Sequence, residues 1–180
     1  MKKLFLLSTV LFISVFSQAQ NTPPVDDESK LITYKKVTEV AGVTKAELYN
    51  RAFTWANTFY KNPANVIREK NAEEGKLVIK ARYKIFDQPD KKTKVAADAG
   101  DVMYTLTIEC KEGKFRYILS SFNWQQVSAF PAERWMDTKN QYYKTDWAGY
   151  LTQTDEMAKK LTADLEKAVI TAPKVKKDEW

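Results

Sequence analysis

The chain has 180 residues, of which 44% are hydrophobic and 29% charged, with a formal net charge of +6. It contains no histidine and one cysteine, which excludes a Cys/His zinc site, a Ser-His-Asp or Cys-His triad and any intramolecular disulfide. Basic and acidic residues are mixed along the chain instead of forming one basic patch, which argues against nucleic-acid binding.

The first 19 residues have the pattern of a secretory signal peptide. Lys2 and Lys3 precede an apolar run from Leu4 to Phe16, and Ser17 and Ala19 have the spacing of a cleavage site. The run is short for a bilayer, which takes about 20 residues, so a retained anchor helix is the less favoured alternative. We therefore expect a periplasmic or secreted protein whose mature chain has no transmembrane segment. The expected parts are a signal peptide at 1–19, a polar leader at 20–30, one domain at 31–171 and a charged tail at 172–180.

The domain begins with a β-rich segment at 31–40 and continues into a helix. Thr44 and Glu47 have the spacing of a capping box, which predicts a helix start at this point. The helix should end at 61–63, where Lys-Asn-Pro follows. Its predicted core face carries Leu48, Ala52, Trp55, Ala56 and Phe59, which recur at helical spacing.

Four strands should follow the helix. A short run at 65–70 comes first, and 76–86 then alternates apolar and basic residues, as a half-buried strand does. Residues 87–100 contain turn formers and charges without periodicity, which indicates a loop. Residues 102–124 are typical of a hairpin, and Cys110, within its first strand, should be a buried apolar side chain rather than a reactive thiol.

A two-residue turn at Glu112 and Gly113 would fix the register of this hairpin. Glu109 would then face Arg116, with apolar pairs on the opposite face of the sheet. The register also pairs Cys110 with Phe115, Ile108 with Tyr117 and Leu106 with Leu119. The predicted core face carries Val102, Tyr104, Leu106, Ile108, Phe115, Tyr117 and Leu119.

The opposite, outer face of the hairpin is the predicted binding surface. It should carry Met103, Thr105, Thr107, Ile118, Ser120, Phe122 and Trp124, joined by Lys80, Arg82 and Lys84 of the preceding strand. Either this face binds something, or the aromatic-rich residues between 125 and 150 fold back over it. We favour the second alternative, because Phe130, Trp135, Tyr142, Tyr143 and Trp147 are too many large rings to leave in water. A final amphipathic helix should run from near Asp146 to Thr171.

Three segments together resemble a family of exported bacterial proteins of unknown function. They are VTEVAGVTKAELYNRAFTWANTF, GDVMYTLTIECKEGKFRYILSSF and the terminal amphipathic helix. The resemblance implies a TATA-box-binding-protein-like (TBP-like) α+β fold in the order β-α-β-β-β-β-α, with two helices packed on one face of a curved antiparallel sheet. It brings no catalytic signature, so it implies architecture and not activity.

The sequence favours a non-enzymatic binding or interaction module of the cell envelope. Its candidate binding residues are Lys80, Arg82, Lys84, Ile118, Phe122 and Trp124, and its ligand would be an envelope protein, a peptide, a glycan or a small molecule. We expect no cofactor and no metal. The alternative is a carboxylate-dependent hydrolase, for example on glycans, with acids such as Glu73, Glu74, Asp98 and Asp101. Nucleic-acid binding, the third hypothesis, is disfavoured by the export signal.

Overall fold

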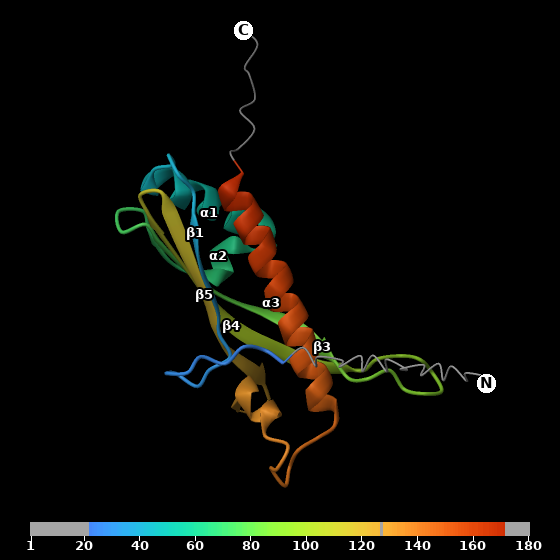
Figure 1. The fold of residues 1–180 in the computed structure, drawn as a ribbon. Coiled ribbons are helices and arrows are strands. Elements are labelled where there is room, and N and C mark those ends of the chain that lie inside the picture. The colour runs from blue at the N-terminus through green and yellow to red at the C-terminus, as the bar shows by residue number, and fades with distance from the viewer. Residues whose placement is uncertain (1–21, 127, 172–180) are drawn as a thin grey trace, which may run out of the picture.

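The computed structural model describes residues 22–126 and 128–171, so the expected signal peptide at 1–19 and the whole of the expected tail at 172–180 lie outside the described residues. One layer is an antiparallel sheet and the other is formed by helices (Figure 1). The strands are β1 (Tyr34–Glu39), β2 (Ile67–Asn71), β3 (Lys76–Phe86), β4 (Asp98–Lys111), β5 (Lys114–Gln125) and β6 (Ala129–Pro131). The helices are α1 (Lys45–Phe59), α2 (Pro63–Val66), the 3-10 helix η1 (Ala132–Met136) and α3 (Asp146–Ile170).

The strand order across the sheet is β1-β5-β4-β3-β2, and β6 pairs with β5. Helices α1 and α3 contact each other and lie on the same side of the sheet (Figure 1). The predicted order of a strand, a helix, four strands and a helix is therefore confirmed, with α2, β6 and η1 as additional short elements. Neither long helix, in the part of the chain that is described, is apolar enough to cross a membrane.

Helix α1 begins where its capping residues place it. Thr44 Oγ1 accepts a hydrogen bond from the backbone N–H of Glu47 at 3.2 Å, which satisfies one donor of the first turn. Leu48 and Trp55 are buried, and each contributes about 1.5–3 kcal/mol by leaving water. Phe59, expected in the core, is 42% exposed, because the helix ends there.

The hairpin of β4 and β5 has the predicted register. Cys110 pairs with Phe115, Glu109 with Arg116, Ile108 with Tyr117 and Leu106 with Leu119. Gly113 has φ +70°, a conformation that glycine adopts without steric cost, and this allows the two-residue turn. All seven residues predicted to face inward are buried.

Cys110 is 1% exposed, as predicted. Burial raises the pKa of its thiol to about 12, so the thiolate is scarce at neutral pH.

Helix α3 carries polar residues within its buried face. Thr154 donates to the carbonyl of Tyr150 at 2.7 Å and accepts from the hydroxyl of Tyr83 at 2.7 Å, which pairs its buried oxygen twice. The amphipathic pattern of the sequence predicts an apolar stripe of Trp147, Leu151, Ala158, Leu161, Leu165 and Ala168. In the structure Leu151 and Ala168 are only half-buried, while Tyr150 and Val169 take core positions.

Candidate binding face

The outer face of the sheet consists of rows of side chains that cross three strands. In the central row, Val78 pairs with Thr107 and Thr107 with Ile118. Each of these three side chains is partly covered by its neighbours, and the rest of it is exposed to solvent. The next two rows, both on the same side of it, are Lys80-Thr105-Ser120 and then Arg82-Met103-Asn123. Both long helices pack on the opposite side, so this apolar and threonine-rich centre forms part of the protein surface.

Basic residues line the β3 side of this face. Lys84 lies 2.5 Å from Asp98, and Arg82 lies 3.3 Å from Asp101. The hydrogen bond between Lys84 and Asp98 raises the pKa of the lysine and lowers that of the carboxyl. Such exposed pairs add little stability, typically below about 1 kcal/mol, so both cations can be shared with a ligand. Lys80 is exposed and forms no ion pair with another described residue.

Ile118, Lys80, Arg82 and Lys84 lie on the outer face as predicted. The placement of Phe122 there is wrong: it is fully buried, with its ring 6.1 Å from that of Tyr34 on the helix side.

Trp124 is also on the helix side. Its indole packs 5.8 Å from Trp135 and 5.6 Å from Tyr150, and its Nε1 donates to the carbonyl of Ala99 at 2.8 Å. The expected placement of this residue on the outer face is therefore wrong as well.

A β-bulge at Ser121 reverses the alternation of β5. Thr105 pairs with Ser120 but Met103 pairs with Asn123, so one extra residue is accommodated opposite Tyr104. Ser121 has φ +59°, the left-handed conformation of a bulge. The buried apolar residues of β5 have odd numbers up to Leu119 and even numbers from Phe122 onward. This change in the alternation is the sequence signal that locates the inserted residue.

The aromatic segment does not cover the outer face, so the favoured alternative of the sequence analysis is wrong. Strand β6 extends the sheet at the edge of β5, with Phe130 opposite Trp124. Trp135, in η1, is fully buried and packs 5.4 Å from Tyr150 of α3. The aromatic segment therefore extends the core on the helix side, and the outer face stays open.

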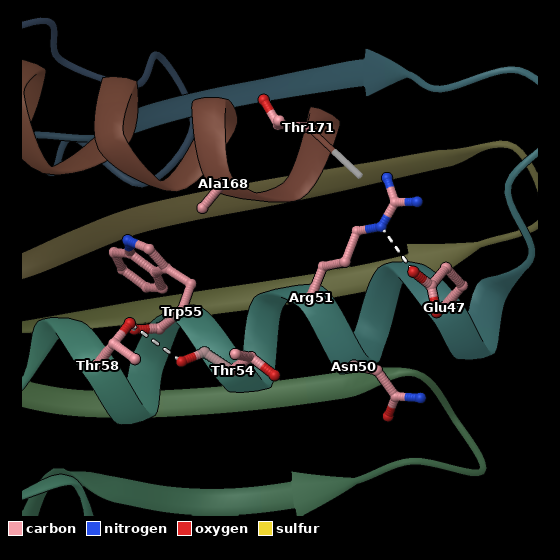
Figure 2. A pocket seen from close by; sticks show the side chains of 8 residues that line it. All are labelled: Glu47, Asn50, Arg51, Thr54, Trp55, Thr58, Ala168 and Thr171. Atoms are coloured by element: carbon pink, nitrogen blue, oxygen red, sulfur yellow. Dashed lines mark hydrogen bonds and ion pairs between the residues drawn. The ribbon is translucent and has the colours of Figure 1, made fainter. Parts of the chain in front are cut away.

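A second candidate site is a cleft of about 290 Å³ between α1 and the end of α3 (Figure 2). Arg51 Nη1 donates to the backbone carbonyls of Val169 at 3.1 Å and Ile170 at 3.3 Å, while its Nε contacts Glu47 at 2.9 Å. Trp55 Nε1 donates to Asp164 at 2.8 Å. Arg51 thus pairs two of the carbonyls that a helix leaves without intrahelical partners at its C-terminal end. We therefore interpret the contacts around this cleft as a cap of α3.

The acids of the hydrolase alternative do not face one another across a cleft. Glu73 and Glu74 are exposed in the turn before β3. Asp98 and Asp101 both lie beside Lys84 on the open face. No group of three or more metal-ligating side chains occurs within residues 22–126 and 128–171. The geometry therefore gives no support to hydrolysis by paired carboxylates.

Comparison with known proteins identifies the fold. The sequence model of DUF4468, a domain of unknown function with TBP-like fold, matches residues 34–125, just over half of the chain. A search of curated protein sequences finds no match.

Two solved structures resemble this chain. A TBP-like protein from Parabacteroides distasonis ATCC 8503 has a TM-score of 0.63 at 16% identity, covering 84% of this chain and 99% of its own. A DUF4468 family protein from Bacteroides ovatus ATCC 8483 has a TM-score of 0.63 at 20% identity, covering 88% and 95%. The likeness at this identity concerns the fold alone.

Proposed function

We propose, from the premise that this chain belongs to the bacterial DUF4468 family of TBP-like α+β domains, that it is a non-enzymatic interaction module of the cell envelope. Its open sheet face docks a protein whose surface is acidic. Export, suggested by residues 1–19, places that partner in the periplasm or outside the cell.

The arrangement of the outer face supports a protein ligand over the other classes. An apolar and threonine-rich centre at Val78, Thr107 and Ile118 is bordered by Lys80 and Arg82, which is the anatomy of a protein interface with an apolar core and a polar rim. The basic rim selects an acidic partner and speeds encounter.

A small molecule or a glycan fits this face less well. The hollow on it, beside Val37, Phe115 and Arg116, has about 220 Å³, below the roughly 300 Å³ where ligand pockets begin. Phe122 and Trp124, the aromatic side chains proposed there from sequence, are directed into the core and offer no ring for a sugar to stack on.

Site-specific photocrosslinking in the native envelope tests this proposal. A photoreactive side chain at Thr107, in the centre of the face, should give a discrete adduct with one acidic protein. The same group at Glu156, exposed on α3, is the matched control and should not give that adduct. Equal adducts from both positions, or none from Thr107, would reject the proposal.

Charge reversal on the rim provides a second measurement. The pair Lys80→Glu and Arg82→Glu should reduce the Thr107 adduct, and added salt should do the same, because exposed charges are screened. Lys91→Glu with Lys92→Glu, in the loop between β3 and β4, is the control of equal charge change. An adduct that is indifferent both to the double substitution on the rim and to added salt would contradict a basic docking rim.

A further inference from the structure

Strand β1 is an edge of the sheet, and the direction of its free backbone groups can be deduced. Val40 donates its N–H to Gly113 at 2.7 Å on the β5 side, and Thr33 donates to Pro24 at 2.9 Å on the opposite side. Backbone groups alternate along a strand, so even-numbered residues of β1 bond to β5. The N–H and C=O groups of Lys35, Val37 and Glu39 therefore point away from the sheet, and no described residue pairs with them.

The side chains of these three residues lie on the outer face, opposite Ile118, Arg116 and Lys114 of β5. Val37 is 60% exposed, more than any other large apolar side chain in a strand of the described chain. Exposed apolar edges recruit further strands, and natural proteins normally protect them. The other edge, β2, is protected, because its pairing is short and interrupted by a bulge between Ile67 and Glu69.

We propose that β1 pairs antiparallel with β1 of a second copy of this chain, about a two-fold axis at Val37. Val37 then faces Val37 of the second copy, and Lys35 faces Glu39 of the second copy on each side of the axis. This register joins the free N–H and C=O groups of all three residues across the interface. It also creates an apolar pair flanked by two opposite-charge pairs on the same face, in which Glu39 of the second copy adds to the ion pair that Lys35 already forms with Asp26 at 2.5 Å.

The choice of a second copy rests on this self-complementarity. A two-fold axis requires that the surface be complementary to itself. Strand β1 meets this requirement, because Lys35 lies two positions before Val37 and Glu39 lies two positions after it. The length of the pairing also fits. Pro24 occupies the edge at Thr33, and the chain turns away at Ala41 and Gly42, so the free segment is the one that the register uses. An acidic extended peptide would find Glu39 unfavourable.

Disulfide trapping tests the register. Directly opposed residues that exchange hydrogen bonds have Cα atoms about 5.5 Å apart, within the range of a disulfide. Val37→Cys should give a covalent dimer under mild oxidation, while Val95→Cys, 66% exposed in a loop, should not. The native Cys110 is buried and does not compete. Equal crosslinking of both variants, or none at position 37, would overturn the proposal.

Charge exchange tests the same pairing without a covalent bond. Glu39→Lys should weaken self-association, measured by sedimentation equilibrium, about tenfold or more, because two attractive pairs become repulsive. Adding Lys35→Glu and Asp26→Asn should restore it, since the pairs then reappear with reversed sign and the Asp26 carboxylate, which pairs with Lys35, no longer repels the new charge. Circular dichroism confirms that each variant is folded. A wild-type protein that is monomeric throughout, or a triple variant that associates no more strongly than Glu39→Lys alone, would exclude this interface.

Discussion

The hydroxyl of Tyr34 donates a hydrogen bond to Asp155 Oδ1 at 2.9 Å, joining the first strand to the last helix across 121 positions of sequence. Asp155 is 1% exposed, and its second oxygen lies 2.6 Å from Lys159 Nζ. A buried carboxylate costs free energy unless it is paired. The contacts of Asp155 with Tyr34 and Lys159 therefore stabilise the packing of α3 on the sheet.

Asp155→Ala should lower the free energy of unfolding by about 2–3 kcal/mol, because it leaves the buried Tyr34 hydroxyl without an acceptor and opens a small cavity. Urea denaturation measures the change. Lys160→Ala, exposed on the same helix, is the control and should change the free energy of unfolding by no more than about 0.5 kcal/mol. A larger loss from the lysine than from the aspartate would contradict this account.

Stability should fall in alkaline solution. Burial, the largest cause, raises the pKa of Tyr60 and Tyr83 well above 10 and that of Tyr104 to about 12. In the unfolded chain these groups ionise near pH 10, so above that pH the unfolded state releases protons that the folded state keeps. Their contribution is complete below about pH 10 and is lost progressively above it.

Urea midpoints between neutral and strongly alkaline pH, together with tyrosinate absorbance, test this dependence. The absorbance should show tyrosines that titrate only when the chain unfolds, and Tyr60→Phe should flatten the loss of stability. If every tyrosine titrates near pH 10 in the folded protein, the buried tyrosines play no such role.

The β-bulge at Ser121 predicts that substitutions at the adjacent residues Ser120 and Ser121 have different effects on the free energy of unfolding. Ser121→Val should lower the free energy of unfolding by about 1–2 kcal/mol, because a β-branched side chain resists a positive φ. Ser121→Gly should be neutral or slightly stabilising. Ser120→Val, on the outer face of the same strand, is the matched control and should change stability by no more than about 0.5 kcal/mol. Thermal unfolding compares the three, and equal effects at both positions would argue against the bulge.

Arg51→Ala should lower the free energy of unfolding by about 1–3 kcal/mol, since the two carbonyls at the end of α3 lose charged donors. Hydrogen exchange should show faster opening of the last turn of α3, with little change near Trp147. Lys167→Ala, exposed in that same turn, is the control. Uniform acceleration along α3 would show that Arg51 acts on the whole helix and is not a local cap.

Features set by local sequence were predictable, and features set by distant contacts were not. The turn at Gly113 and the cross-strand pair Glu109–Arg116 agree on one register, so the hairpin was found correctly. The face of Phe122 was wrong because strict alternation was carried through Ser121, where the chain inserts a residue. The contact of Arg51 with Val169 spans 118 positions, and nothing local to either residue indicates it.

Of the aromatic residues between 125 and 150 that were expected to be buried, Trp135 and Trp147 are buried but Tyr142 is 73% exposed, and the buried rings lie on the other side of the sheet from the one expected. The hydrophobicity of these rings predicts that they are buried, but it does not predict on which side of the sheet. Only the reversal of β5 at Ser121, which turns Trp124 toward Trp135, decides the side. The export signal and the binding role of Lys80, Arg82, Lys84 and Ile118 stay predictions.

The bare side of the sheet gives this fold unusual freedom to diverge. Alternate residues of β3, β4 and β5 contribute nothing to the hydrophobic interior, so a lineage can replace Thr105, Thr107 or Ser120 at little cost to folding. The backbone can then persist while most side chains differ, as the likeness in fold to the TBP-like protein from Parabacteroides distasonis at 16% identity illustrates.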